Sequence, residues 1–269
     1  MRVALIGWGA INQTVASMIT DRSPADGSPI EIVAVAVRQH PDVPLRGLPS
    51  GARILTNPSQ LATLSVDVVA EAASRDSVKP WGRAALQSGA DFVVSSVSAF
   101  ADHTLLDSLR RLAATTSTQI IVQPGALGGI DALSAARPLG LDRVEHRIVK
   151  PPAAWKNTPA EALCHLDSLV EPEVFYSANA AETAAQFPKN ANVAMTTALA
   201  GVGPEATVIS LVADPSIDTN QHLITASGPF GRLAVTIENN PLPANPKTSG
   251  MAAYNLARTI MNRVNPIVL

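Results

Sequence analysis

Cysteine is nearly absent from this 269-residue chain, since Cys164 is the only one. One thiol excludes an intramolecular disulfide framework and fits a reducing cytoplasm. The residues beside it, Leu163 and His165, provide no metal-ligand spacing. We therefore expect a cytoplasmic protein without a bound metal, in which Cys164 is a buried structural residue.

Charge is scarce as well, at 16% of the residues, and 20 Lys and Arg against 22 Asp and Glu give a formal net charge of −2. Nucleic-acid-binding domains usually carry a basic excess, so no nucleic-acid partner is expected. The longest apolar runs, residues 32–37 and 66–73, are far shorter than the ~18 residues of a membrane-spanning helix. The chain is therefore predicted to be soluble, without a membrane partner.

The first half of the chain alternates short apolar runs with helical patterns. Strands are expected at residues 2–7, 30–38, 66–71, 91–95 and 119–123. Helices are expected at residues 10–20, 74–88 and 102–115, and a shorter one begins at Asn57-Pro58. This alternation predicts an N-terminal α/β domain of the Rossmann type, whose parallel sheet is covered on both faces.

The alternation stops after Pro124. Helices are expected at residues 128–136, 159–169, 178–199 with a break at Phe187-Pro188, and 248–264. Strands are expected at residues 143–150, 173–177, 207–213, 221–227 and 232–238, and a linker at 239–246. The last two strands flank Gly228-Pro-Phe-Gly231, which is a hairpin signal. A second α+β domain with a mixed or antiparallel sheet is predicted, in which three strands close in sequence form a sheet that offers a face for self-association.

Residues Gly7-Trp8-Gly9-Ala10-Ile11-Asn12 follow the first strand and open the first helix. They form a GxGxxG dinucleotide-binding fingerprint in which Asn12 replaces the last glycine. Gly7 allows the tight turn, and Gly9 lets a pyrophosphate approach the free N–H groups at the helix N-terminus, at Ala10 and Ile11. The position between a strand and a helix makes a cofactor site the favoured interpretation.

The end of the second strand, Val37-Arg38-Gln39-His40, bears on the choice of cofactor because it contains no acid. An acid there would accept from the ribose of NAD and repel the 2′-phosphate of NADP, whereas Arg38 can pair with that phosphate. We predict that NADP is accepted and leave its preference over NAD open. The alternative is that Arg38 is a solvated loop charge and NAD is used.

Four segments of the second half point to a family. They are Gly125-Ala-Leu-Gly-Gly-Ile-Asp131, Phe187-Pro-Lys-Asn-Ala-Asn192, Asp214-Pro215 with Asn220-Gln-His222, and Asn245-Pro-Lys-Thr-Ser249. In this order, after a dinucleotide-binding fold, they resemble the L-aspartate dehydrogenase family along essentially the whole chain. Glu71-Ala-Ala73, residues 95–102 and Lys150-Pro-Pro152 also look like segments of that family. The departures, which bear on cofactor preference and pocket shape, are Asn12, Ser98, Ala191 and Met195.

The resemblance implies an NAD(P)-dependent dehydrogenase. The reaction would be oxidative deamination of L-aspartate to iminoaspartate, which hydrolyses to oxaloacetate and ammonia, together with the reverse reductive amination. The resemblance places the catalytic histidine on His222 and cofactor contacts on Ala126 and Asn192, and it implies a homodimer. The product would enter NAD biosynthesis or amino-acid degradation, between which the sequence does not choose.

The same topology would return the final helix to the first domain. We therefore expect residues 1–125 with 240–269 to form the dinucleotide-binding domain. Residues 126–239 would form the substrate, catalytic and oligomerisation domain.

Histidine also suits the chemistry. Hydride can leave Cα only when the amine is neutral, so a base with a pKa near neutrality, ~6.5 for histidine, is suited to take the amine proton. His222 lies among polar residues on a predicted strand, and His103, at a helix start, is the rival. His146 is interpreted as structural, while His40 and His165 are expected in a loop and on a surface helix.

A dicarboxylate substrate requires local cations. Lys150, at a strand end, is the first candidate, and Lys189 and Lys247 are weaker ones. The amide of Asn192 can contact the nicotinamide ribose or carboxamide, whereas Asn190 is interpreted as a helix cap. Ala126 is expected to contribute backbone and the absence of bulk, together with Gly125, Gly128 and Gly129, since close approach of a cofactor requires small residues.

Two other functions remain as alternatives. One is an NAD(P)H-dependent reductase of another small carbonyl or imine, whose catalytic lysine or His/Lys-rich loop is not evident here. The other is a non-catalytic dinucleotide sensor, which would need the turn at Gly7 and Gly9 but not His222.

Overall fold

The computed structural model describes residues 1–21 and 29–268, without the side chains of residues 246 and 247. The chain divides into two compact units, each described by itself. Unit 1 consists of Met1–Gly125, Leu242–Thr248 and Ala252–Leu269, and unit 2 of Ala126–Pro241 and Ser249–Met251.

Unit 1 contains a six-stranded sheet in the order β3-β2-β1-β4-β5-β6. The strands are β1 (Arg2–Ile6), β2 (Glu31–Ala36), β3 (Arg53–Leu55), β4 (Val68–Glu71), β5 (Asp91–Val94) and β6 (Ile120–Val122). Every pairing is parallel, which confirms the Rossmann-type prediction. The strand order reverses between β1 and β4, and the carboxyl ends of strands at such a point are where this fold binds ligands.

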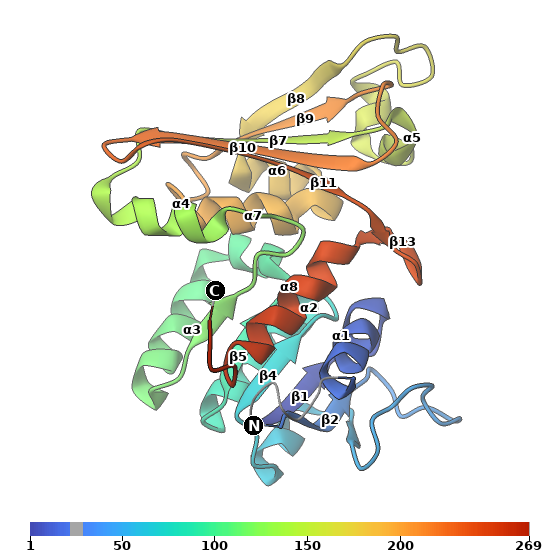
Figure 1. Cartoon of the computed structure of the whole chain (residues 1–269), viewed down its shortest axis with the longest axis vertical. Helices are drawn as coiled ribbons and strands as arrows, with labels where there is room; N and C mark the ends of the chain where they lie inside the picture. Colours follow the sequence, from blue (N-terminus) through green and yellow to red (C-terminus); the bar gives the residue numbers. More distant parts are fainter. Residues whose placement is uncertain (22–28, 269) are drawn as a thin grey trace. The chain divides into compact units, whose positions relative to one another are not determined.

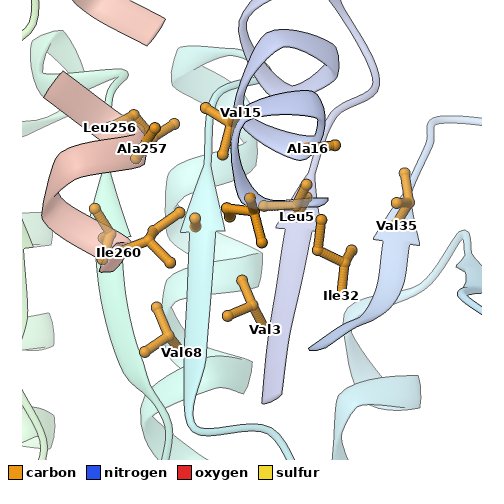
Figure 2. Packing of buried hydrophobic residues seen from close by; sticks show 13 residues of the cluster. Val3, Leu5, Val15, Ala16, Ile32, Val35, Val68, Leu256, Ala257 and Ile260 are labelled. Atoms are coloured by element: carbon orange, nitrogen blue, oxygen red, sulfur yellow. The ribbon is translucent and has the colours of Figure 1, made fainter. Parts of the chain in front are cut away.

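Helices cover both faces of this sheet. Figure 2 shows α1 (Ala10–Thr20) and α8 (Gly250–Met261) over one face, where Val15 and Leu256 belong to the same buried cluster as the strand residues Val3 and Leu5. On the opposite face lie α2 (Arg75–Gln87) and α3 (His103–Thr116). Gly82 of α2 lies so close to Phe92 of β5 that a Cβ atom there would meet the ring at 2.9 Å.

Unit 2 contains a five-stranded mixed sheet in the order β11-β10-β7-β9-β8. The strands are β7 (Arg143–Lys150), β8 (Glu173–Asn179), β9 (Val208–Ala213), β10 (Asn220–Gly228) and β11 (Gly231–Asn239). Only β7 and β9 run parallel, while the other pairs are antiparallel. The helices α4 (Ile130–Ala136), α6 (Ala180–Gln186) and α7 (Ala191–Ala200) lie along one face of it (Figure 1). The expected mixed sheet is confirmed, but it has five strands and not three.

Short 3₁₀ helices complete the two units. They are η2 (Pro58–Thr63), η3 (Val97–Ala101), η4 (Arg137–Leu139), η5 (Pro159–Ala162) and η6 (Pro188–Asn190). Asn57 caps η2 with a side-chain bond from the Ser59 N–H, as the Asn-Pro signal predicts. The expected break at Phe187-Pro188 is confirmed, because α6 ends at Gln186 and η6 follows.

Three expectations about secondary structure are wrong. Residues 159–169 form only η5 after the short α5 (Pro152–Trp155), because Ala160, Cys164 and Leu166 all enter the core at a spacing that one helix face cannot present. The expected linker at 239–246 contains β12 (Pro241–Leu242) and the start of β13 (Asn245–Ser249), which pair. The edge strand β3 was not expected, since three residues carry too little periodicity.

Candidate active site

The turn after β1 has the geometry of a phosphate-binding loop. Gly7 has a φ of +93°, and a Cβ atom there would lie 2.8 Å from the Cβ of Ala73. At Gly9, by contrast, a Cβ atom would meet nothing within 4 Å. No described side chain caps the N-terminus of α1, and its first turn has no acid. The free N–H groups of Ala10 and Ile11 thus face open space at a positive helix end, which fits a dinucleotide pyrophosphate.

Asn12 explains how the fingerprint works without its third glycine. The side chain is fully buried, and its Nδ2 donates to the carbonyl oxygens of Ile6 and Gly7, both at 2.9 Å. These bonds join the first turn of α1 to the end of β1 and hold the Gly7 turn in shape. A glycine at this position would only allow close packing of helix and strand, whereas the Asn12 side chain also stabilises the loop through hydrogen bonds.

Glu71, at the carboxyl end of β4, organises the neighbouring loops. Its buried carboxylate accepts from the N–H groups of Ala73 and Ser74, the hydroxyl of Ser77, and both the N–H and the hydroxyl of Ser96. One carboxylate thus fixes the loops after β4 and β5 beside the Gly7 turn.

Arg38 lies two residues beyond the end of β2 and is exposed to solvent. In this fold the end of the second strand approaches the adenosine ribose, so the guanidinium is within the region where a 2′-phosphate would bind. No acid occupies residues 37–40, as the sequence already indicates.

Side-chain hydrogen bonds fix the backbone of the segment around Ala126. Gly125, with a φ of +67°, donates its N–H to the side chain of Gln123, and its carbonyl accepts from Asn255. The Ala126 carbonyl accepts from Asn239 within unit 2. Ala126 itself is buried and small, as a close cofactor contact requires.

Gly128 and Gly129 have a packing role that the sequence did not indicate. A Cβ atom at Gly128 would lie 2.5 Å from Ile237, and one at Gly129 would lie 2.6 Å from Val235. Both partners belong to β11, so these glycines allow the start of α4 to pack on the sheet.

His222 lies on β10 in the interior of unit 2 and is 6% exposed. It pairs with Ile148 of β7 in the antiparallel register, so it shares a sheet face with His146 and Lys150, the residues two positions to either side of Ile148. His222 Nδ1 lies 3.0 Å from His146 Nε2. Burial and the nearby Lys150 cation lower the pKa of His222 to about 3, well below the near-neutral value expected from the sequence.

Lys150 ends β7 and extends over the Trp155 ring, with Nζ 4.8 Å from the ring centroid. Its Nζ donates to Asn190 Oδ1 at 2.5 Å. Burial, and then the charge of Lys189, lower the pKa of Lys150 to about 8. Two cations thus lie near each other on unit 2, an arrangement that favours a ligand with two negative charges.

The interpretation of Asn190 as a helix cap is wrong. Asn190 does precede α7, but its side chain makes no capping bond and instead accepts from Lys150. Asn192 lies exposed in the first turn of α7, two residues from the Lys150 partner. The side chain of Lys247 lies outside the described residues.

The other histidines are separate from this group. His40 is exposed in the loop after β2, and His103 is exposed at the start of α3 in unit 1. His165 follows η5 in an irregular segment and not in the expected surface helix. His146, by contrast, is fully buried and contacts both His222 and Thr197, so the sequence interpretation of it as structural overlooked its place beside the candidate base.

Sequence reasoning missed His146, Thr197 and Asn190 as parts of this group. The period of two along β7 does place His146 and Lys150 on one face. It does not give the register with β10 or the contact with α7, and those decide which residues meet His222.

Two further observations concern the described residues. They contain no group of three or more His, Cys, Asp or Glu side chains that could hold a metal ion. None of the helices in this part of the chain is long and apolar enough to cross a membrane.

Comparison with known proteins gives the same family for the whole chain. A family model described as "Aspartate dehydrogenase, C-terminal" matches residues 131–263, and one described as "Homoserine dehydrogenase, NAD binding domain" matches residues 7–123. L-aspartate dehydrogenase of Brucella anthropi is 49% identical over 99% of this chain and 98% of its own length. The enzyme of Ralstonia pickettii is 39% identical over 99% of both chains.

Solved structures agree. Aspartate dehydrogenase of Thermotoga maritima superposes with a TM-score of 0.78 and 25% identity, over 100% of this chain and 99% of that one. A hyperthermophilic archaeal homoserine dehydrogenase in complex with NADPH, 13% identical with a TM-score of 0.64 over 97% of this chain and 96% of that one, shares the fold. By its sequence along the full length, and with its Rossmann-type unit followed by a mixed-sheet unit, the chain belongs to the L-aspartate dehydrogenase family.

Proposed function

We propose that His222 is the catalytic base of this NAD(P)-dependent L-aspartate dehydrogenase. The enzyme oxidises L-aspartate to iminoaspartate, which yields oxaloacetate and ammonia, and it catalyses the reverse reductive amination. The observation that supports the assignment is the position of His222, a neutral, buried histidine beside Lys150, on a chain of this family.

When bound, a nicotinamide dinucleotide would supply the hydride chemistry. Gly7, Gly9, Ala10 and Ile11 would bind its pyrophosphate through backbone N–H groups and the helix N-terminus. We assign Ala126 and Asn192 as the residues of unit 2 that would contact the nicotinamide half of the cofactor. We assign dinucleotide binding to residues 1–125 with 240–269, and substrate binding and catalysis to residues 126–239.

His222 moves the protons of the reaction. It accepts a proton from the substrate ammonium group, which frees the nitrogen lone pair that drives hydride departure from Cα. After it releases that proton to solvent, the neutral ring accepts a second proton, from the water that attacks the imine carbon. The low pKa keeps the ring neutral in the free protein, and a substrate carboxylate paired with Lys150 offsets the cation that contributes to lowering it.

Lys150 and Lys189 bind the two carboxylates of the substrate. Asn190 orients the Lys150 ammonium group, which also lies over the face of the Trp155 ring. Because buried carboxylates need charge-assisted partners, this pair gives the specificity for a four-carbon dicarboxylate over a monocarboxylate.

We propose that NADP is accepted as well as NAD, because Arg38 stands where an acid would exclude the 2′-phosphate. We also propose a homodimer formed through the sheet face of unit 2 that α4, α6 and α7 leave open, on which Leu223 is half-buried and Thr225 is exposed. Size-exclusion chromatography with light scattering tests the dimer. A cytoplasmic location fits the free thiol of Cys164, and cell fractionation tests it.

The central test follows NAD(P)H absorbance with oxaloacetate and ammonia. The wild-type protein is expected to turn over, and His222→Ala is expected to lose about 100-fold or more in kcat. His103→Ala, which removes an exposed histidine of unit 1, is the matched control and should keep wild-type activity. If the wild-type protein fails with both cofactors, the reaction is wrong and a dinucleotide sensor is favoured. If His222→Ala is fully active, the assignment of the base is wrong.

A further inference from the structure

Three side chains of unit 2 form a continuous hydrogen-bonded row behind the candidate base. His222 Nδ1 lies 3.0 Å from His146 Nε2, and His146 Nδ1 lies 2.9 Å from the hydroxyl of Thr197. The Thr197 hydroxyl also lies 3.1 Å from the Val193 carbonyl one turn earlier in α7. His146 and Thr197 are fully buried, so their polar atoms cannot form hydrogen bonds with bulk water in place of these contacts.

Only one set of directions turns all three contacts of this row into hydrogen bonds. In that set the Val193 carbonyl, which can only accept, receives the single hydroxyl proton of Thr197. The Thr197 oxygen must then accept from His146 Nδ1–H. A neutral histidine carries one ring proton, so His146 Nε2 has a lone pair and must accept from His222 Nδ1–H. The proton of His222 therefore lies on Nδ1, and its Nε2 presents a lone pair.

Neutral rings are required for this count. Burial, and then the proximity of His222, hold the pKa of His146 well below its ordinary value. Lys150, on the other side of His222, adds a positive charge that opposes protonation of that ring as well. Two imidazoles joined by one hydrogen bond and flanked by a cation are thus both uncharged in the free protein.

We infer that Thr197 and His146 are positioning residues that fix the tautomer of His222, so that Nε2 is the atom that accepts the substrate proton. The inference deepens the proposed function and rests on His222 as the base. If Thr197 instead donated to His146, every bond would reverse, and His222 Nε2 would carry a proton and could not act as a base. A threonine on a neighbouring helix thus sets the orientation of the catalytic lone pair.

The direct test is a long-range ¹H–¹⁵N NMR spectrum of the protein labelled with ¹⁵N-histidine, with His222 and His146 assigned by substitution. The wild-type spectrum is expected to show both rings protonated at Nδ1. In Thr197→Val the last acceptor of the row is lost, so His146 and His222 are expected to change toward the Nε2–H form. Thr197→Ser, which keeps the hydroxyl, should keep the wild-type pattern.

Kinetics supply the second readout. Thr197→Val is expected to lower kcat for reductive amination by about 10- to 100-fold, as loss of a partner that orients a functional group does, with the KM for NAD(P)H unchanged. Thr197→Ser should restore most of that loss. Thr183→Val is the matched control, because Thr183 is also fully buried and donates to a carbonyl one turn earlier, that of Asn179, without contact to either histidine.

The outcomes separate the inference from the proposed function. A wild-type spectrum with His222 protonated at Nε2 overturns the inference, and so does a Thr197→Val protein with an unchanged tautomer and rate. A wild-type protein that binds cofactor but does not turn over oxaloacetate would refute the proposed function, while the NMR spectrum would still decide the tautomer.

Discussion

Buried His222 should make the free energy of unfolding of this protein fall at acidic pH, and a substitution of His222 should remove that part of the pH dependence. In the native state the pKa of His222 is about 3, because of burial first and the Lys150 charge second, against an ordinary value of 6.5. Below pH 6.5 His222 therefore binds a proton in the unfolded chain but stays unprotonated in the native state. Stability is lost as the pH falls from about 6.5 toward 3.

The magnitude follows from linkage. The contribution of His222 is present in full above about pH 7.5; about 2 kcal/mol of it is lost at pH 5 and about 4 kcal/mol at pH 3. In His222→Asn the amide replaces ring Nδ1 as a donor to His146 but does not titrate. This variant should lose about 2 kcal/mol less than the wild-type protein between pH 8 and pH 5.

The measurement is urea unfolding at pH 8 and pH 5, followed by the fluorescence of Trp155, which is fully buried in unit 2. Trp8 and Trp81, both in unit 1, are replaced by Phe in both proteins so that the signal reports unit 2. Equal losses of stability in the wild-type protein and His222→Asn would refute the reasoning, because they would show that the ring is not held neutral by the fold.

Three further predictions concern the two ligand-binding regions. Arg38→Asp should lower kcat/KM for NADP relative to NAD by about tenfold or more, since a repulsive charge replaces an attractive one; an unchanged ratio would show that Arg38 is a solvated loop charge. Lys150→Met should raise the KM for oxaloacetate by about tenfold or more. The wild-type KM should also rise above pH 8, because Lys150 has a pKa of about 8 and loses its proton there. A wild-type KM that does not change with pH would contradict this role of Lys150. Gly7→Ala should lower the free energy of unfolding in urea by about 1–3 kcal/mol, because Gly7 has a φ of +93° and its Cβ would lie 2.8 Å from Ala73. Gly9→Ala should lower it little, since the space around Gly9 is open. Equal losses in the two variants would be evidence against strain at Gly7.

The sequence predicted most of unit 1 because its signals are local. Short apolar strands, helix starts and the Gly7-Trp-Gly9 turn each depend on a few neighbouring residues, and the parallel order follows from alternation of strands and helices. The edge strand β3 and the irregular segment 159–169 were not predicted correctly. Their conformation depends on pairing with β2 and on packing into the core of unit 2, and neither is encoded in a local period.

The sequence by itself indicated the fold class, the dinucleotide turn and the family, and it singled out His222 as the candidate base. Only the tertiary structure decided what surrounds that histidine. The register of β10 on β7 brings His222 between His146 and Lys150, and the packing of α7 adds Thr197. Burial then changes the expected near-neutral base into a neutral ring with a low pKa. Charge, tautomer and pKa depend on groups far apart in the chain and on the exclusion of water, so they follow from the three-dimensional packing and not from the order of the residues.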